Sequence, residues 1–344
     1  MSSKVSVVTI TFNLLKAGRE KSFIQCLESV HNQTYKNIEH WVIDGGSTDG
    51  TVDLIQKYAK KNWVKYISEP DHGIYDAMNK GIRCSTGNYV AFLNSDDFWH
   101  NNQGVEFSVR ALDASQAAFS FSPSYTLFHD RPAHKVFTSI GSVLMRMPFC
   151  HQTMFTRRDV LIKEGMFDDS NFRSAADFNL ILRLCLAGYK SVFVPEIFTS
   201  YRHGGFSAID IDISAQECIK SFYMEYKKID SSFSLEDAAA VYRDKVFSQS
   251  FLHKVLPYLH RDIQNLFEHL PKTEIAPGKI KIMDPEYSYP MSIYEVGPGY
   301  PPVLLEQRTW KTFGVPFMRL KFFTNGKEFS FLGLPLYRRK DQQI

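Results

Sequence analysis

Residues 38–61 read IEHWVIDGGSTDGTVDLIQKYAKK and contain one strand–turn–helix unit. The segment IEHWVID has the pattern of a strand, and it stops at two glycines. Cap-forming residues follow, and TVDLIQKYAKK has the apolar spacing of an amphipathic helix. The unit therefore predicts a strand and a helix, with Asp44 at the carboxyl end of the strand.

The same alternation recurs on both sides of this unit. Strand patterns and helix patterns follow one another in five more segments: VSVVTITF (5–12), KSFIQCLESV (21–30), VKYISEP (64–70), GIYDAMNKGI (73–82) and YVAFLNSDD (89–97). Repeated units of this length predict a parallel sheet with helices on both faces and right-handed crossovers. Ligands of such sheets bind at the carboxyl ends of the strands.

The length of 344 residues indicates one large domain with an appendage, or two domains. Beyond about residue 213 the pattern changes to two or three helices, and then to a Pro- and Tyr-rich stretch that is typical of a linker. We therefore expect an α/β domain in residues 1–213, a helical extension in 214–270, and a linker with a basic, aromatic tail in 271–344.

Composition excludes several classes of protein. Hydrophobic residues make up 44% and charged residues 22%, and the formal charge of +3 is too balanced for nucleic acid as the main partner. The five cysteines form no CxxC pair, which favours reduced thiols and a cytoplasmic location. The N-terminus has no signal-peptide pattern, and no apolar window is long enough for a membrane span.

The C-terminal segment from Gln307 to Ile344 is basic, with eight Lys or Arg against two acids. Such a segment is usually a solvated surface. Because Phe, Leu and Tyr are interleaved with the cations, peripheral contact with the anionic cytoplasmic face of the inner membrane is the alternative.

Acids at two strand ends point to a nucleoside diphosphate. Asp44 is placed where α/β folds read a ribose or base, but the turn TFNLLKAGRE (11–20) lacks the Gly-rich pattern that holds phosphates. The Asp96–Asp97 pair offers another device, because carboxylate oxygens bind Mg²⁺ or Mn²⁺, which bridges two phosphates.

At these motifs the chain resembles the family 2 inverting glycosyltransferases of the GT-A fold. The resemblance covers about the first 210 residues and rests on seven segments: VTITFN (8–13), QTYKNIEHWVIDGGSTDGT (33–51), EPDHGIYDAMNKGI (69–82), GNYVAFLNSDD (87–97), CHQTMFTRRDVLIKEGMFDD (150–169), SAADFNLILRL (174–184) and YRHGGFS (201–207). It implies a Rossmann-like mixed sheet flanked by helices, a UDP-sugar donor, and Mn²⁺ or Mg²⁺ as cofactor.

The resemblance also implies roles in donor binding. It makes Thr11 and Asn13 part of the wall around the base, and Asp44 the ligand of base or ribose. Asn94, Ser95 and Asp96 occupy the position of the family's DxD motif, with Asn94 in place of the usual first acid.

Further roles concern the metal, the acceptor and the base. The departure at Asn94 leaves Asp96 as the expected direct metal ligand, while Asp97 shares the metal or orients the donor sugar. His203 falls where some members add a metal or phosphate contact. Asp177 matches the catalytic base, although Ala176 replaces the acid that often precedes it.

His151 and Gln152, which follow Cys150, are expected to line the acceptor cleft, although each is alternatively a packing residue. Asp76 and Lys80 are expected at the donor, with Lys80 near the diphosphate; their i,i+4 spacing also fits a plain pair on a helix surface.

Structural alternatives exist for the acids as well. Asp44 fits a strand-ending turn, and one acid of the Asp96–Asp97 pair fits a helix cap. Asp177 fits a helix start regardless of function, because an acid is favourable at the positive end of the helix dipole.

The sequence therefore predicts a metal-dependent transferase that moves a hexose or N-acetylhexosamine to a glycan or lipid-linked oligosaccharide, with inversion. A bacterial surface polysaccharide is the product that the resemblance implies. One rival is a sugar-nucleotide pyrophosphorylase, which needs the Gly-rich loop that is missing here. The other is a nucleotide- or glycan-binding module without catalysis, a reading suggested by Asn94 and Ala176.

Overall fold

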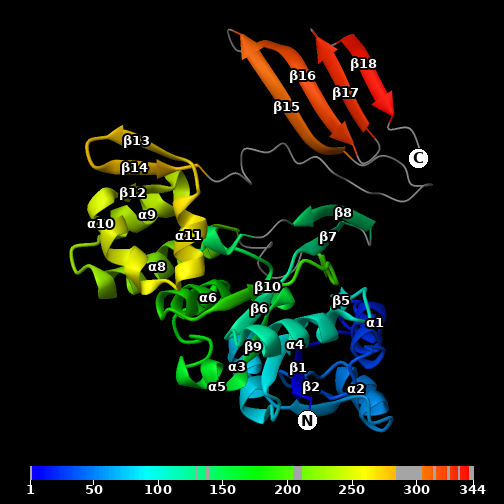
Figure 1. Ribbon diagram of the computed structural model, residues 1–344. Helices are drawn as coiled ribbons and strands as arrows, with labels where there is room; N and C mark the ends of the chain where they lie inside the picture. Colours follow the sequence, from blue (N-terminus) through cyan, green and yellow to red (C-terminus); the bar gives the residue numbers. More distant parts are fainter. Residues whose placement is uncertain are drawn as a thin grey trace.

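The structure is a computed structural model that describes residues 2–128, 131–136, 139–203 and 211–283, together with four C-terminal strands (Figure 1). The elements of the N-terminal half are β1 (Val5–Thr11), α1 (Glu20–His31), β2 (Ile38–Asp44), α2 (Thr51–Ala59), β3 (Lys65–Ser68), α3 (Ile74–Cys84), β4 (Tyr89–Phe92), β5 (Phe98–Trp99), α4 (Gly104–Ser115), β6 (Phe119–Phe121), β7 (Ser124–Phe128) and β8 (Arg131–Val136).

The elements of the middle of the chain are the short 3₁₀ turns η1 (Ile140–Ser142) and η2 (His151–Thr153), β9 (Phe155–Arg157), α5 (Arg158–Lys163), α6 (Ala176–Leu186), β10 (Ser191–Phe193), β11 (Thr199–Arg202), α8 (Ile211–Ile229), α9 (Leu235–Asp244), β12 (Val246–Ser248), α10 (Gln249–Val255), η3 (Leu256–Tyr258), α11 (Arg261–Glu268), β13 (Lys272–Ala276) and β14 (Lys279–Ile282).

A seven-stranded sheet in the order β10-β6-β9-β4-β1-β2-β3 forms the centre of the molecule. The strands β3, β2, β1 and β4 run parallel to one another, as the repeated units predict. Strand β9 is antiparallel to both β4 and β6, in agreement with the mixed sheet that the resemblance implies. Because η2 turns the chain at the carboxyl edge, β9 leaves that edge in the opposite direction, and the sheet is mixed.

Helices cover both faces of the sheet. Alternate residues of one strand face opposite sides: Val8 joins a core cluster with Met78 of α3, whereas Val7 joins another with Val30 of α1. Val7 and Val8 are at most 1% exposed, so the sheet is buried on both sides. This explains why the strands read as continuous apolar runs in the sequence.

Strand register brings polar side chains together at the carboxyl edge. Thr11 is the register partner of Asp44, and Asp44 is the partner of Ser68 on the other side. A smaller sheet in the order β5-β11-β7-β8 adjoins this edge through β5, which follows the Asp96–Asp97 pair. The register therefore fixes where the predicted site residues gather.

The helices α8–α11 form a lobe beside α6 (Figure 1). Its core is continuous with that of the sheet, since Phe222 of α8 packs edge-on against Phe178 of α6 with 5.1 Å between ring centroids. Strand β12 pairs with β14, and β14 pairs with β13. The expected linker from residue 271 therefore begins with strands that complete this lobe.

The segment expected as a basic tail contains the strands β15 (Leu304–Thr312), β16 (Val315–Phe323), β17 (Gly326–Phe331) and β18 (Leu334–Lys340), paired as an antiparallel sheet in that order. The sequence pattern missed these strands, because a four-stranded meander of nine residues or fewer per strand has only weak local signals.

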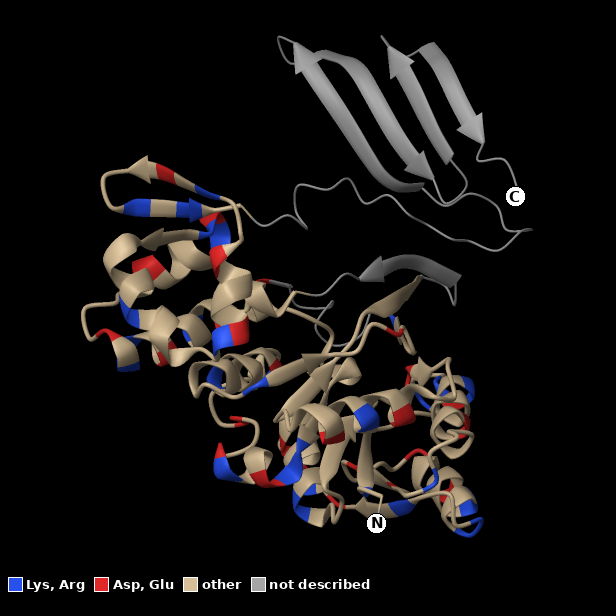
Figure 2. Cartoon of the chain, viewed as in Figure 1, with Lys and Arg blue, Asp and Glu red and all other residues tan. Residues whose placement is uncertain are grey.

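Lysines and arginines are interspersed with acids along the helices and loops of the sheet domain and of the lobe (Figure 2). A helix with the length and hydropathy needed to cross a membrane does not occur in the part of the chain that the structure describes.

Candidate functional site

Asp44 holds the turn that follows β2. Its carboxylate is fully buried and accepts hydrogen bonds from Thr11 Oγ1 at 3.0 Å, Ser68 Oγ at 2.8 Å and Ser47 Oγ at 2.5 Å. The backbone amides of Gly46 and Ser47 donate to it as well. Five donors thus contact the two carboxylate oxygens, as expected for an acid that stabilises the turn at the end of a strand. The contact of Asp44 with a nucleotide stays a prediction.

Asn13 and Thr11 support the same turn. Asn13 adopts a left-handed backbone conformation with φ 46°, and its side-chain oxygen accepts from the amide of Thr48 at 3.1 Å. Its own amide donates to Ser47 Oγ at 2.7 Å. Thr11 is 5% exposed, and the contact of both residues with a base stays a prediction.

Phe12 is the residue of this wall that the sequence did not single out. The sequence pattern predicts that Phe12 is part of the strand of residues 5–12, but its side chain is 63% exposed. Gly45 faces it: a Cβ atom on Gly45 would lie 3.3 Å from the Phe12 ring and 2.5 Å from Asp71 Oδ2. The only sequence signal was an aromatic residue directly after a strand that ends at the ligand edge.

Asp76 and Lys80 have the geometry of the i,i+4 pair. Lys80 Nζ lies 3.6 Å from Asp76 Oδ2 and 3.1 Å from Glu69 Oε1, and it donates to the carbonyl of Pro70 at 2.7 Å. Asp76 also accepts from the amide of His72. These contacts tie α3 to the turn before it, and the donor roles of both residues remain predictions.

The Asp96–Asp97 pair places two carboxyl groups next to each other in the chain after β4. Asp97 is 3% exposed, and burial followed by the charge of Asp96 raises the pKa of its carboxyl to about 7. Asp96 is more accessible, and its Oδ2 pairs with Arg19 Nη1 at 3.0 Å. Asn94 and Ser95 form the turn before the pair, and the amide of Asp97 closes it on the carbonyl of Asn94. Neither acid caps a long helix, because a two-residue strand follows.

Arg202 and Gln152 hold Asp97 from two sides. The amide of Arg202 donates to Asp97 Oδ1 at 2.6 Å, and Gln152 Nε2 donates to Asp97 Oδ2 at 2.6 Å. Gln152 also accepts from the amide of Asn94 at 2.8 Å and is 3% exposed. Its amide group is thus used within the protein, and its contact with an acceptor stays a prediction.

Asp177 lies in the first turn of α6, and its side chain is 16% exposed. Its Oδ2 pairs with His151 Nδ1 at 2.9 Å, and its Oδ1 accepts from Tyr75 Oη at 3.0 Å and the amide of Phe178 at 2.8 Å. Burial by itself would raise its pKa, but the hydrogen bond from His151, with the other donors, holds the pKa of Asp177 below its usual range. The hydrogen bond from the amide of Phe178 is a contact that any acid at a helix start can make. The contacts with Tyr75 and His151 are not explained by the helix start alone.

The turn η2 connects the two acids. Within it, His151 binds Asp177 and Gln152 binds Asp97. Cys150 lies between them: burial raises the pKa of its thiol to about 12, and the charges of Asp97 and Asp177 contribute. Two acids that are eighty residues apart in sequence therefore form one site through a pair of adjacent side chains.

Glu217 of α8 is a further residue that the sequence did not reveal. Its carboxylate accepts from three successive amides, those of Arg173 at 2.8 Å, Ser174 at 2.8 Å and Ala175 at 2.9 Å, directly before α6. A carboxylate at this end of a helix is favoured by the helix dipole. The lobe therefore fixes the start of the helix that carries Asp177, and a contact across forty residues leaves no local pattern.

His203 follows β11, next to the residue whose amide binds Asp97. Its own amide donates to the carbonyl of Leu127. A cluster of three or more His, Cys, Asp or Glu side chains placed to hold a metal is not found among the described residues. The structure thus brings Asp96 and Asp97 together but does not assemble the predicted three-residue ligand set with His203.

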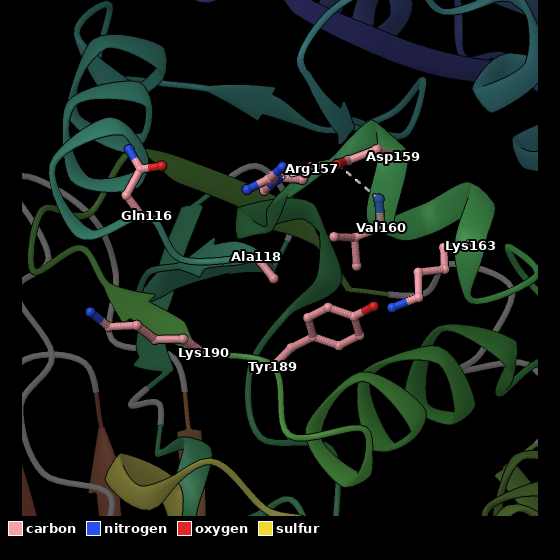
Figure 3. A pocket seen from close by; sticks show the side chains of 8 residues that line it. All are labelled: Gln116, Ala118, Arg157, Asp159, Val160, Lys163, Tyr189 and Lys190. Carbon is pink, nitrogen blue, oxygen red and sulfur yellow. Dashed lines mark hydrogen bonds and ion pairs between the residues drawn. The ribbon is translucent and has the colours of Figure 1, made fainter.

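A cavity of about 340 Å³ lies between the β9–α5 region and Tyr189 (Figure 3). Its basic members are engaged: Arg157 pairs with Asp159 at 2.8 Å, and Lys190 donates to the carbonyl of Ser115. Arg157 is the register partner of Tyr89, the first residue of β4. The cavity therefore opens at the amino edge of the sheet, away from the acids.

Comparison with known proteins gives the class of this fold and site. The model of glycosyl transferase family 2 matches residues 6–163. An uncharacterized glycosyltransferase of Mycobacterium tuberculosis is 34% identical over 187 residues, which are 53% of this chain and 69% of that protein. An uncharacterized glycosyltransferase of Rickettsia bellii is 31% identical over 183 residues, which span only 25% of its length.

Solved structures share the fold at low identity. Staphylococcus aureus TarS 1–349 in complex with UDP-GlcNAc has a TM-score of 0.53 and 17% identity, over 77% of this chain and 78% of that chain. The mannosyltransferase PcManGT of Pyrobaculum calidifontis, in complex with GDP-Man and Mn²⁺, has a TM-score of 0.54 and 17% identity, over 75% and 74%. The fold is that of a GT-A glycosyltransferase, as the sequence predicted. The chain belongs to glycosyltransferase family 2.

Proposed function

We propose that this protein transfers a sugar from a UDP-sugar to a hydroxyl group of a glycan or lipid-linked oligosaccharide, with inversion at the anomeric carbon. The observation that carries the proposal is the turn η2, which joins two acids whose pKa values are displaced in opposite directions. Such pairs separate the roles of acid groups in sites for sugar chemistry.

The nucleotide is placed at the carboxyl edge of β1 and β2. The exposed ring of Phe12 gives a flat apolar surface for a base, beside the turn that Asp44 holds. TarS binds UDP-GlcNAc and PcManGT binds GDP-Man at the same fold, which supports a nucleotide-sugar donor.

A divalent cation, Mn²⁺ or Mg²⁺, fits the acids at the end of β4. Asp96 is the accessible ligand, whereas Asp97 is held by Gln152 and Arg202 and stands behind it. One carboxylate suits these ions, which keep several waters and bind substrate phosphates. When bound, the cation neutralises the negative charge of the departing diphosphate.

Asp177 is assigned to removal of the acceptor's proton. The carboxylate is ionised at neutral pH because three donors surround it. A single base group opposite the leaving group gives single displacement, so an α-linked UDP donor is expected to yield a β-linked product.

The experiment is a panel of nucleotide sugars, tested for donor hydrolysis and transfer with and without Mn²⁺. We expect turnover with at least one UDP-sugar and loss of turnover when the cation is chelated. A retained α configuration in the product would contradict the single-displacement mechanism.

The same panel separates the rivals. A pyrophosphorylase would release a sugar phosphate and nucleoside triphosphate in the presence of diphosphate. A binding module would bind UDP but turn over no donor. Either result would replace the transferase assignment.

Peripheral membrane contact from the cytoplasmic side is part of this proposal, because the acceptor class includes lipid-linked glycans. The charge of residues 307–344, with eight cations and two acids, supports it. Deletion of this segment should release the protein from anionic vesicles; equal retention of the truncated and full chains would refute the contact.

A further inference from the structure

We infer that the acceptor hydroxyl gives its proton to Nε2 of His151, and that Asp177 acts through this imidazole. The inference rests on the proposed function and refines the part assigned there to Asp177. His151 thus becomes the residue that touches the reacting group, and Asp177 becomes the residue that orients it.

The first support is the direction of the imidazole. His151 Nδ1 lies 2.9 Å from Asp177 Oδ2, so a neutral ring that donates from Nδ1 has its lone pair on Nε2. Nε2 is shielded from solvent and has no hydrogen-bond partner within the described part of the chain. A buried polar atom without a partner calls for an explanation, and a reacting hydroxyl group is a matching one.

The second support is the occupancy of Asp177. Its Oδ1 already accepts from Tyr75 Oη and from the amide of Phe178, and its Oδ2 from His151. These donors favour the ionised form, which makes the carboxylate a weak acceptor for one more proton. They also fix its orientation toward the ring, as in arrangements where an acid holds a histidine base.

The third support is the position of His151 in the chain. Its neighbour Gln152 binds the carboxylate of Asp97 and the amide of Asn94, the turn that carries the proposed cation ligand Asp96. His151 is therefore adjacent in the chain to Gln152, which holds the turn where the diphosphate is proposed to bind.

The step balances as follows. The acceptor O–H proton moves to His151 Nε2, and the oxygen's electron pair forms the new bond to the anomeric carbon. The bond from that carbon to the diphosphate oxygen breaks, and its electron pair leaves with the nucleoside diphosphate. The imidazolium is stabilised by Asp177 and later releases its proton to solvent.

The decisive variant is His151→Asn, compared with wild type for kcat and for donor KM. Asparagine can still donate from its amide to Asp177, in the manner of Nδ1, but it has no basic atom. A positioned general base contributes about 10²- to 10⁴-fold, so kcat should fall by at least about a hundredfold with donor KM and UDP binding unchanged. The matched control is Tyr75→Phe, which removes another donor to Asp177 and should lower kcat less than about tenfold.

A second measurement covers the case in which the substitution disturbs folding. His151→Gly leaves space for free imidazole, which should restore part of kcat in proportion to its concentration. If His151→Asn keeps kcat within about tenfold of wild type, or if imidazole has no effect on His151→Gly, the proton goes directly to Asp177 and the inference is overturned while the transferase stands. A wild-type protein without turnover on any donor would instead remove the proposed function, and the inference with it.

Discussion

Asp97 is buried and Asp177 is partly buried, yet their surroundings displace the pKa values of the two carboxyl groups in opposite directions. Asp97 faces another acid and has its pKa raised, whereas Asp177 faces His151 and has its pKa lowered. The difference lies in the neighbours, because burial favours the neutral form of both. The ionised form of Asp97 is disfavoured until a cation relieves the repulsion between the two acids, whereas the ionised form of Asp177 is favoured.

The comparison shows that one short turn, η2, can supply a different neighbour to each of the two acids. Gln152 is neutral and positions Asp97 without cancelling its charge, while His151 can carry the proton that Asp177 stabilises. The feature to test is therefore the contrast between Asp97, whose ionised form is disfavoured, and Asp177, whose ionised form is favoured.

The largest effect is expected for Asp177→Asn. The amide keeps the shape but cannot stabilise a proton on His151 or accept one, so kcat should fall about 10²- to 10⁴-fold. UDP binding, measured by calorimetry, should remain within about threefold because Asp177 lies outside the donor contacts. Wild-type turnover in this variant would remove Asp177 from the chemistry altogether.

The pH dependence of stability sharpens the same contrast. In the folded protein Asp97 keeps its proton up to about pH 7, whereas an unfolded chain releases it near pH 4. The folded state then binds more protons between these values, so the free energy of unfolding falls as pH rises through this window. Asp97→Asn cannot ionise, and relative to wild type it should gain on the order of a few kcal/mol between pH 4 and pH 8.

This gain is measured by urea unfolding in the presence of a chelator, and any constant cost of the amide cancels in the comparison across pH. Asp177→Asn is the control with the opposite sign. The lowered pKa of Asp177 stabilises the fold above pH 4, and that contribution disappears as the pH falls below this range. A wild-type and Asp97→Asn difference that does not change with pH would contradict the assigned environment of Asp97.

A smaller effect is expected for Gln152→Ala. The substitution leaves Asp97 Oδ2 and the amide of Asn94 without their partner, which loosens the turn that carries Asp96. Residues that orient metal ligands typically contribute about 10- to 100-fold to metal affinity. Mn²⁺-dependent UDP binding should weaken by that factor, whereas binding without Mn²⁺ should change little. Equal weakening under both conditions would indicate a general loss of structure.

The sequence predicted the strands β1 to β4 well, because each is a short apolar run that ends at Gly or at a polar turn. It also placed Asp44 and Asp96–Asp97 at one edge, since parallel strands must end together. It gave no strand at β9, because the three residues Phe155 to Arg157 are too few to show a strand pattern.

The pairings inside the site could not be read from the sequence. His151 and Asp177 are each unremarkable in their own segments, and their contact depends on where η2 leaves the sheet. Asp44 shows the converse: its position was predicted, but register supplies Ser68 as a donor and satisfies the carboxylate. Position along a strand is local information, whereas the partner of a side chain is not.

The smallest effect is expected for Glu217→Gln, which tests whether the lobe contributes to the settled environment of Asp177. The amide retains one oxygen but turns an N–H₂ group toward backbone donors of the segment before α6. Loss of a helix cap costs about 1 kcal/mol, so the free energy of unfolding should fall by about that amount. The kcat should fall less than about tenfold, because Tyr75 and His151 still hold Asp177.

The matched control is Glu236→Gln, an exposed acid in the first turn of α9 that should leave kcat unchanged. If Glu217→Gln loses stability but keeps kcat equal to that of the control, α8 supports α6 only as a scaffold. If kcat falls while the protein stays folded at the assay temperature, Glu217 helps to position Asp177 through its hydrogen bonds to the three amides before α6.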